Sequence, residues 1–261
     1  AIPGAFDVAT VNHGLRAEAA EECALVAAAC AERDVPCAVL GVTVGAGNVQ
    51  AQARQARYEA LKNWAIERDL AAVATAHHAD DQAETLLMRL NRGSGLSGLA
   101  GVRSTQHIFP LPHHGIRLLR PLLGFRCSEL ADVVTQSGLS FVTDPSNEHL
   151  HYDRVRTRKA IAGADWLDPR KVAQSAELLA EALDAVDHLV MAEFADRAVW
   201  QGDDAWRFFP GAHRFIEIEV IGKVFGKLGR DVSRTDLATL RDRLSNGENA
   251  SLAGILVTPD V

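Results

Sequence analysis

Two patterns of apolar residues alternate along the first part of the chain, one typical of strands and one typical of helices. Short apolar runs of strand length lie at residues 6–11, 36–44 and 71–76. Each run is followed by a segment with apolar residues at helical spacing, in residues 18–33, 49–68 and 80–90. Strands that alternate with helices in this way predict right-handed crossovers. We therefore expect an α/β fold in which helices cover both faces of a parallel sheet.

The pattern changes after Arg158. Before that point, a short strand from Arg117, a helix over residues 127–137 and a turn at DPSN (144–147) complete the α/β part. Beyond it, the patterns predict two long helices and one short strand, at residues 169–194, 233–244 and 215–220 respectively. This change predicts a domain boundary near residue 160, with a smaller, mainly helical domain after it.

Composition narrows the class of protein. With 261 residues and 48% hydrophobic content, the chain can bury a sizeable core. Its formal net charge of −7 excludes a uniformly basic surface that coats nucleic acid, although local patches can still bind phosphates. The sequence shows neither a membrane-span run nor a signal-peptide pattern, so we expect a cytoplasmic protein that does not enter membranes. The four cysteines lack a C-x-x-C pair, and Cys23 and Cys30 share an apolar helix face, which favours buried thiols in a reducing compartment.

The stretch VATAHHADDQAETLLMRLNRGSG (73–95) concentrates ionisable side chains directly after a predicted strand. A zinc site needs at least three convergent ligands, whereas the adjacent His77 and His78 at a strand end point to opposite faces. Asp81 and Glu84 fit a capping box with Asp81 as the N-cap, and acidic residues suit the first turn of a helix. Capping leaves both histidines unexplained. A helix that opens beyond a parallel strand is also a common place for a phosphate, a Mg²⁺ ligand or the amine of a substrate.

Cationic side chains gather at two other places. Arg54 and Arg57 lie one turn apart on the preceding helix, and they could bring positive charge to the same strand-end crevice or form a solvated face. The run RVRTRK (154–159) carries four cations in six residues. Such a run is usually solvated surface, but it also suits a polyanion. Arg89 and Arg92 extend it toward the segment RGSGLSGLAGV, whose four glycines favour a loop or a close-packed turn that could hug a ligand.

These pieces together resemble the tRNA(Ile)-lysidine synthase family, which belongs to the N-type ATP pyrophosphatases, or PP-loop proteins. The resemblance rests on five stretches in the order of that family: VNHGLR (11–16), NVQAQARQARYEAL (48–61), AHHADDQAETLLMRLNRGSGLSGLAG (76–101), RPLL (120–123), and DPSN followed by YDRVRTR (152–158). It covers residues 7–160 well and the remainder weakly. Each stretch alone has modest specificity, and their shared order makes the match strong.

The resemblance implies an enzyme that uses ATP and Mg²⁺ to adenylate the wobble cytidine of a tRNA(Ile) with a CAU anticodon. The amine of L-lysine then displaces AMP and forms lysidine, which changes the codon and amino-acid identity of the tRNA. By the same resemblance, residues 1–159 form the PP-loop nucleotide-binding domain, and residues 160–261 form a domain associated with the substrate or tRNA. A homodimer is an open expectation.

Motif matching assigns the roles to residues of this sequence. Asp81 and Arg57 look like the catalytic pair around the activated base and the phosphate, and His78 is similar to the family histidine beside the nucleotide. Glu84 looks like the carboxylate that binds lysine. The strand end expected to border the nucleotide consists of Asn12, His13 and Gly14. The expected tRNA contacts are Arg89, Arg92, Arg154, Arg156 and Arg158, and the metal ligands are unknown.

Three features depart from the family pattern. The SGGxDS pyrophosphate loop does not occur in these 261 residues, and the first strand looks like the family's second, so we expect the preceding strand, loop and helix before Ala1. Asn12 replaces the usual acidic residue, and Val155 stands where the family often has Asn. The tRNA-binding domain of longer members is likewise expected beyond Val261. Two alternatives stay open: a related pyrophosphatase that thiolates tRNA and shares an HHxDDxxET-like helix, and an inactive RNA-binding fragment.

Overall fold

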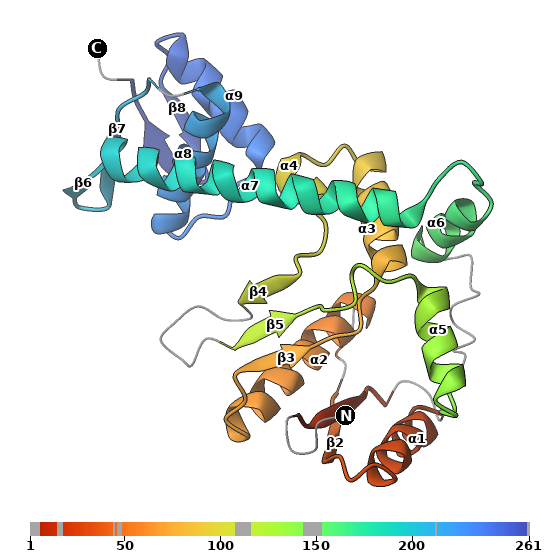
Figure 1. Cartoon of the computed structure of the whole chain (residues 1–261). Coiled ribbons are helices and arrows are strands. Elements are labelled where there is room, and N and C mark those ends of the chain that lie inside the picture. The colour runs from red at the N-terminus through yellow and green to blue at the C-terminus, as the bar shows by residue number, and fades with distance from the viewer. Residues whose placement is uncertain are drawn as a thin grey trace. The chain divides into compact units, whose positions relative to one another are not determined.

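The chain forms two compact units in the computed structural model, and they divide between Ala180 and Glu181. The structure describes residues 6–14, 18–43, 45, 49–107, 116–142, 153–211 and 213–259. Figure 1 traces the chain from red at the N-terminus to blue at the C-terminus. The turn expected at DPSN lies outside the described residues. This division lies at a different place from the domain boundary predicted near residue 160. The predicted boundary separates two functions, which the division into compact units does not test, so it stays a prediction.

The first unit begins with strands and helices in turn. Its elements are β1 (Val8–Asn12), α1 (Ala19–Ala31), β2 (Cys37–Gly41), α2 (Val49–Glu67), β3 (Ala72–Ala74), α3 (Ala79–Asn91), α4 (Leu96–Leu99), β4 (Thr105–His107), β5 (Arg117–Leu119), α5 (Cys127–Gln136), α6 (Asp153–Ala162) and the start of α7 (Pro169–Arg197). The three strands and three helices expected before residue 92 are all confirmed, because their apolar periods are long enough to specify each element locally.

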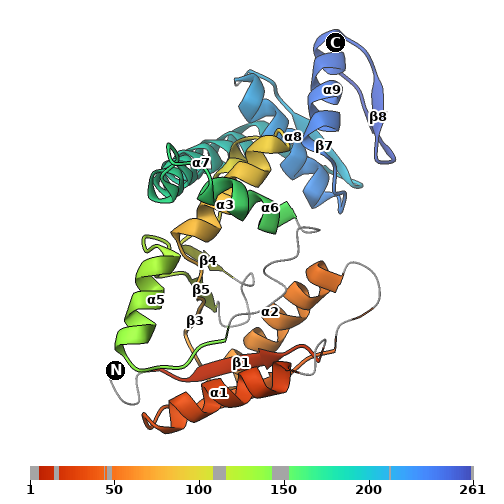
Figure 2. The ribbon, with the colours of Figure 1, turned by 90° about the vertical axis from the view of Figure 1, so that its right-hand side faces the viewer.

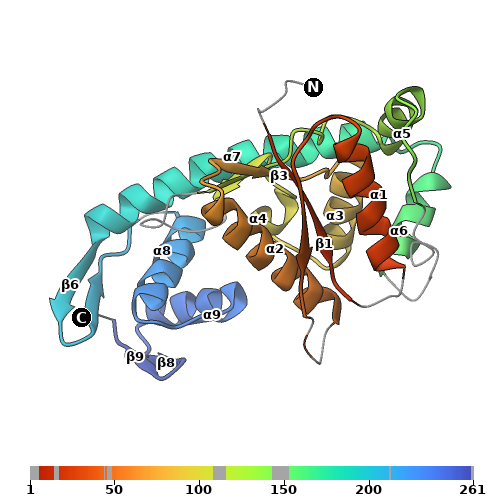
Figure 3. The ribbon, with the colours of Figure 1, turned by 90° about the horizontal axis from the view of Figure 1, so that it is seen from below.

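The strands pair in two described sheets. β1 and β2 run parallel, with Val8 opposite Cys37. β3 and β5 also run parallel, with Ala72 opposite Arg117, and β4 joins β5 as an antiparallel neighbour. The predicted parallel pairing therefore holds for both pairs, and the antiparallel β4 was not expected. Figure 3 shows α1 and α2 on opposite sides of β1, which is the covering by helices that parallel strands need.

One face of α2 forms the main apolar contact of the first unit. Tyr58, Leu61 and Ala65 recur at helical spacing, and Leu61 and Ala65 are buried. They pack with Val73 of β3, with Leu118 of β5, and with partly buried apolar residues of β1 and β2. Because α2 contacts both strand pairs, it holds the carboxyl ends of β1 and β3 at the same side of the fold, where parallel sheets bind ligands.

The glycine-rich segment is a packed turn against α3 and includes the short helix α4. The buried Gln82 exchanges two hydrogen bonds with Val102, from Nε2 to the carbonyl oxygen at 2.8 Å and from the backbone N–H to Oε1 at 2.7 Å. Arg89 donates from Nη1 to the carbonyl oxygens of Gly98 and Gly101, at 2.6 and 3.1 Å. The close packing expected from the glycines is confirmed, and its partner is the chain's own α3.

The second unit contains the end of α7 and six further elements: β6 (Ala198–Gly202), β7 (Ala205–Phe208), α8 (Arg214–Lys227), α9 (Arg234–Ser245), β8 (Ala250–Leu252) and β9 (Ile255–Val257). The strands form two antiparallel pairs, β6 with β7 and β8 with β9. Within the described residues, no helix, including the 29-residue α7, has the length and hydropathy of a membrane span.

The strand predicted at residues 215–220 is wrong, because these residues lie inside α8. The six-residue window alternates apolar and acidic positions, but the buried residues continue beyond it at helical spacing. Ile218, Ile221 and Phe225 are buried together with Leu237 and Leu240 of α9. Packing against α9 thus decides the structure of a segment whose short pattern was ambiguous between the two periods.

We expect Gly101→Ala to destabilise the first unit more than Gly138→Ala. Both glycines have a left-handed φ, of +68° and +67°, so either substitution costs about 1 kcal/mol in backbone strain. A Cβ at Gly101 would lie 2.6 Å from Oε1 of Gln82, whereas a Cβ at Gly138 meets nothing within 4 Å. The clash adds about 1–3 kcal/mol. Urea unfolding of both variants measures the difference, and equal losses would contradict the proposed contact.

Candidate functional site

The end of β1 forms one edge of the candidate site. The strand stops at Asn12, whose Oδ1 accepts a hydrogen bond from the backbone N–H of Gly14 at 2.9 Å. Gly14 has a φ of +61°, so the chain turns sharply at this point. His13 lies between them, and burial lowers its pKa, with a further decrease from the positive charge of Arg57. The structure therefore brings Arg57 of α2 within electrostatic reach of the strand end, which is one of the two alternatives that the sequence left open.

The end of β3 lies within reach of the same cations. His77 follows β3, and its Nδ1 is 2.9 Å from Oγ1 of Thr75. Burial lowers the pKa of His77 from its usual value near 6.5 to about 4. The Asp81 charge opposes this shift, while the charges of Arg120, Arg54 and Arg57 add to it. His77 is consequently neutral at pH 7 and stands between a cationic and an anionic region.

Helix α3 begins earlier than the sequence suggested. The N-cap is His78, with an extended backbone, and the helix begins at Ala79. Asp81 is the third helical residue, and its Oδ2 accepts a hydrogen bond from the backbone N–H of His78 at 3.1 Å. The expected capping box of Asp81 with Glu84 is therefore wrong. Asp81 closes the box from inside the helix, which leaves Glu84 for another partner.

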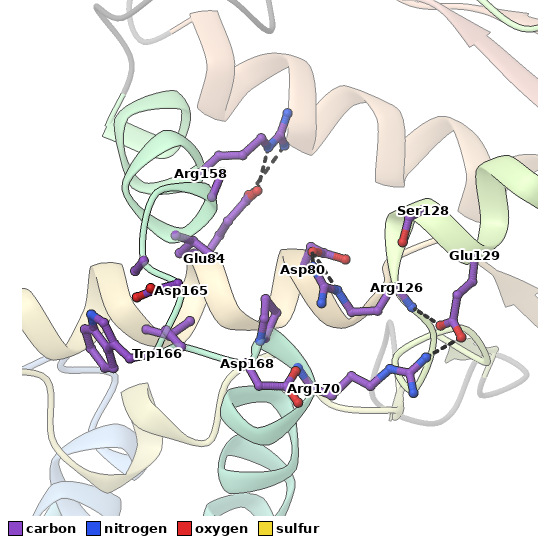
Figure 4. A pocket seen from close by; sticks show the side chains of 15 residues that line it. Asp80, Glu84, Arg126, Ser128, Glu129, Arg158, Asp165, Trp166, Asp168 and Arg170 are labelled. Carbon is purple, nitrogen blue, oxygen red and sulfur yellow. Dashed lines mark hydrogen bonds and ion pairs between the residues drawn. The ribbon is translucent and has the colours of Figure 1, made fainter.

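Glu84 is the most buried charged side chain of the site. Only 1% of the residue is exposed. Its Oε1 accepts from Nε of Arg158 at 2.6 Å, and its Oε2 accepts from Nε of Arg154 at 2.6 Å. Arg154 also donates from Nη2 to Oδ1 of Asp81 at 2.6 Å. Figures 2 and 4 show the geometry, with α6 beside α3 and Arg158 reaching Glu84. We call these two arginines, with Asp81 and Glu84, the arginine clamp.

The predicted tRNA arginines all have partners within the chain. Arg154 and Arg158 belong to the arginine clamp, and Arg89 binds the glycine-rich turn. Arg92 donates from Nη2 to Oδ2 of Asp153 at 3.0 Å, and Arg156 is also paired with Asp153. Two arginines of the basic run thus bind the buried Glu84, whereas Arg156 is paired at the surface. The i, i+4 spacing of Arg154 and Arg158 was the only hint of a shared partner in the sequence.

A hollow of about 650 Å³ lies beside the arginine clamp, and we call it the acidic pocket. Its charged lining residues are Asp80, Glu84, Glu129, Asp165, Asp168, Arg126, Arg158 and Arg170. Five carboxylates against three guanidiniums give the described lining a formal charge of −2. Figure 4 shows them on α3, at the start of α5 and around the loop between α6 and α7. Such a lining favours a cationic ligand, for example an ammonium group.

Asp80 joins two walls of the acidic pocket. It accepts hydrogen bonds from Nε of Arg126 at 3.0 Å and from the backbone N–H of Cys127 at 2.7 Å. Burial raises the pKa of Asp80, but the hydrogen bonds from Arg126 and Cys127 outweigh it, and the net pKa is lowered. Glu129 in turn accepts from the backbone N–H of Arg126 at 2.8 Å and pairs with Arg170.

The wall formed by α5 and the start of α7 was missed by sequence reasoning. Arg126, Glu129 and Arg170 lie outside the stretches that drew attention in the sequence, and each contacts a partner on another element or at a helix start. Nothing in the sequence around α5 indicated that these three residues share a pocket with side chains of α3. The described residues contain no group of three His, Cys, Asp or Glu side chains placed to hold a metal.

Comparison with known proteins agrees with this geometry. Residues 4–164 match the family model described as PP-loop domain. The chain is 44% identical over 256 residues to a tRNA(Ile)-lysidine synthase of Novosphingobium aromaticivorans, covering 97% of this chain and 78% of the relative. It is 42% identical over 199 residues to a protein of the same name from Zymomonas mobilis, covering 76% of this chain and 60% of that relative.

A solved structure shares the fold. The U34-tRNA thiolase NcsA from Methanococcus maripaludis superposes with a TM-score of 0.53 at 16% sequence identity, covering 67% of this chain and 61% of that chain. At this identity the likeness supports the α/β architecture alone. The predicted fold class, a parallel sheet with helices followed by a helical region, is confirmed by the family model and this structure together.

We expect Arg158→Met to destabilise the first unit by about 1–3 kcal/mol, because it leaves the buried Glu84 with one cation instead of two. Arg156→Met is the matched control. Arg156 lies two residues away on α6 and is paired only at the surface, so its loss should cost about 0–0.5 kcal/mol. Urea unfolding at neutral pH measures both. Equal stability of the two variants would show that the arginine clamp contributes little.

The neutral state of His77 predicts a pH dependence. Because its folded-state pKa lies below the value near 6.5 of the unfolded chain, protons bind the unfolded state better between these values. The free energy of unfolding should therefore fall as the pH drops from about 7 toward 4, and His77→Gln should reduce this fall. Comparison of the two proteins by NMR identifies the His77 resonance. A titration of that resonance near its usual pKa would contradict the burial argument.

Proposed function

Since this chain belongs to the tRNA(Ile)-lysidine synthase family of PP-loop proteins, we propose that it carries out ATP-dependent carbon–nitrogen ligation on tRNA(Ile). In this reaction ATP adenylates the wobble cytidine of a CAU anticodon, and the amine of L-lysine then displaces AMP. The observation that carries the proposal is the carboxylate pair of the half-buried Asp81 and the buried Glu84, joined by Arg154 beside the acidic pocket, at the start of the helix that bears the family's motif.

The charge distribution supports separate places for the two small substrates. The acidic pocket has a formal charge of −2 and suits the ammonium groups of lysine. The strand ends carry His13 and a neutral His77 under the influence of Arg57, which suits the phosphates of ATP. We assign the nucleotide side to Asn12, His13 and Gly14, in agreement with the roles that the motifs imply.

Asp81 lies between these two regions. Its charge raises the pKa of His77 on the nucleotide side, and its carboxylate accepts a hydrogen bond from Arg154 on the lysine side. We therefore propose that Asp81 contacts the reacting cytidine or the incoming amine, that Arg57 stabilises the developing phosphate charge, and that His78 lies beside the nucleotide. Asp80, Asp81 and Glu84 are all bound by arginine, so we place Mg²⁺ on the ATP phosphates rather than on these carboxylates.

The arginine clamp refines the proposed role of Glu84. Because 1% of Glu84 is exposed and both of its oxygens bind arginine, an ammonium group reaches it by displacing Arg154 or Arg158. The displaced guanidinium then becomes a donor for an RNA phosphate, which joins the two roles that the sequence suggested for α3 and α6. Arg89 keeps its place on the glycine-rich turn, so we propose that it supports RNA binding through that turn.

Three further features complete the proposal. The four cysteines are free thiols; Cys23 and Cys30 are buried as predicted, whereas Cys37 is half-buried and Cys127 is exposed, so the predicted burial holds for two of them. We propose a cytoplasmic location, where free thiols stay reduced. Because the relatives are named tRNA(Ile)-lysidine synthase, we propose tRNA(Ile) as the RNA substrate and lysine as the amine. A homodimer stays a prediction, which sedimentation of the protein measures directly.

Two alternatives differ in their product. A thiolating pyrophosphatase would leave sulfur on the tRNA, but the solved thiolase shares only the fold with this chain. An inactive RNA-binding fragment would bind tRNA without consuming ATP. Mass spectrometry of nucleosides from tRNA treated with the complete gene product, ATP and lysine separates these outcomes from lysidine formation.

We expect the complete gene product to form lysidine, and Asp81→Asn to lower turnover by about 100-fold or more. Glu84→Gln should raise the KM for lysine more than the KM for ATP, because its carboxylate lies in the lysine region. Asp132→Asn, on the exposed side of α5, is the control and should behave as the wild type. Circular dichroism checks folding. Near-normal turnover of Asp81→Asn would reduce that residue to a helix cap.

A further inference from the structure

A tryptophan is exposed next to the acidic pocket. Trp166 lies in the loop between α6 and α7, and 81% of the residue is exposed. Figure 4 labels it at the edge of the acidic pocket, away from Arg126 and Glu129. Exposed aromatic rings are costly in water and frequently mark binding surfaces. Trp166 lines the acidic pocket, but it is not among the residues to which a role toward ATP or lysine has been assigned.

Trp166 also lines a second hollow, of about 460 Å³, which we call the aromatic pocket. Its apolar lining includes Leu87 and Met88 of α3 and Ile161 of α6. Trp166 and Ile161 line both hollows, so they stand between the acidic pocket and the aromatic pocket. A ligand that extends beyond the acidic pocket at this wall reaches the aromatic pocket next.

The two hollows have opposite charges. The ionisable lining residues of the aromatic pocket are Arg92, Arg156 and Asp153, a formal charge of +1, whereas the acidic pocket carries −2. The side chains of Arg92 and Arg156 are 60% and 64% exposed, and both contact the single carboxylate of Asp153. Each guanidinium has five N–H donors, which exceeds what one shared carboxylate can accept. The aromatic pocket therefore repels an ammonium group and attracts an anion.

A flat aromatic wall, an apolar floor and a pair of arginines together match the chemistry of a nucleotide. Every nucleobase offers a π-face for stacking on tryptophan, and the phosphate beside it is a ligand for guanidinium groups. An aliphatic ligand would leave the two arginines without a function. An acidic peptide would use the arginines but would not need the exposed ring.

We propose that the aromatic pocket holds an unpaired nucleotide of the substrate RNA that neighbours the reacting cytidine. Its base stacks on Trp166, and its phosphate binds Arg92 and Arg156. This inference rests on the proposed function, which brings the reacting cytidine to the carboxylates of α3. The shared wall then lets consecutive nucleotides enter adjacent hollows, so that Trp166 helps to position the cytidine by holding the base beside it.

The test compares Trp166→Ala with Trp166→Phe in the complete gene product. Anisotropy of a labelled anticodon stem-loop of the CAU tRNA measures RNA affinity. We expect Trp166→Ala to weaken binding by about 5- to 100-fold, the range found when one stacked base loses its aromatic partner. Trp166→Phe retains a ring and should stay within about 3-fold of the wild type. Trp200→Ala, which removes a half-exposed tryptophan of the second unit, is the control and should not change affinity.

A second pair of measurements separates stacking from a general loss of structure. Binding of ATP to Trp166→Ala, measured by calorimetry without RNA, should equal that of the wild type, because the strand ends assigned to ATP do not include Trp166. Arg92→Met should weaken RNA binding and reduce the slope of affinity against salt by about one, because one phosphate contact is lost. An unchanged salt slope contradicts the proposed phosphate contact.

Two outcomes overturn the inference. The first is wild-type RNA affinity of Trp166→Ala, and the second is an equal loss in Trp166→Phe. If the first outcome comes with a change in the sedimentation of Trp166→Ala, this surface is a contact between copies of the chain. Failure of the proposed function is seen separately, as wild-type protein that forms no lysidine while Trp166→Ala still weakens RNA binding.

Discussion

The buried carboxylate of Glu84 is the interaction on which the site depends. A carboxylate with 1% exposure is stable inside a protein only with close cationic partners, since an unpaired buried charge costs several kcal/mol, on the order of the stability of a domain. Both partners, Arg154 and Arg158, come from α6, a helix whose described residues include one buried apolar side chain, that of Val155. These ion pairs therefore join α6 to α3 beside Ile161 and Trp166, which lie between the acidic pocket and the aromatic pocket.

The same constraint orders the charges around the start of α3. Asp80 binds Arg126, and Asp81 binds the His78 backbone and Arg154. Glu84 binds Arg154 and Arg158. Each of these three carboxylates, which lie within five residues, thus has a different set of hydrogen-bond donors. On the other side, burial keeps His77 neutral among the charges of α2. The surroundings thus change from cationic to anionic over one turn of helix, which suits the proposed reaction between an adenylated base and an amine.

The loop between α6 and α7 carries the side chain to which we assign nucleotide stacking. It contributes Asp165 and Asp168 to the acidic pocket and Trp166 to both pockets. Because the arginine clamp fixes the end of α6, and because Arg170 at the start of α7 pairs with Glu129, both ends of the loop are tied to the first unit. An exposed aromatic ring on a loop held at both ends is a pre-organised surface, which lowers the entropy that a bound nucleotide must lose.

The sequence alone determined the order of strands and helices before residue 92, because each apolar pattern there is long enough to distinguish a helix from a strand. It also determined the family, since five motifs stand in one order, and it predicted roles for Asp81, Glu84 and the cationic Arg57 that stay predictions. Only the tertiary structure decided what the charges contact. It placed residues 215–220 in α8 through packing on α9, made His78 rather than Asp81 the N-cap, and joined Glu84 to Arg154 and Arg158, which lie 70 and 74 residues away. Local periodicity specifies which face of an element is buried, whereas the partner of a charged side chain depends on which distant element the fold brings beside it.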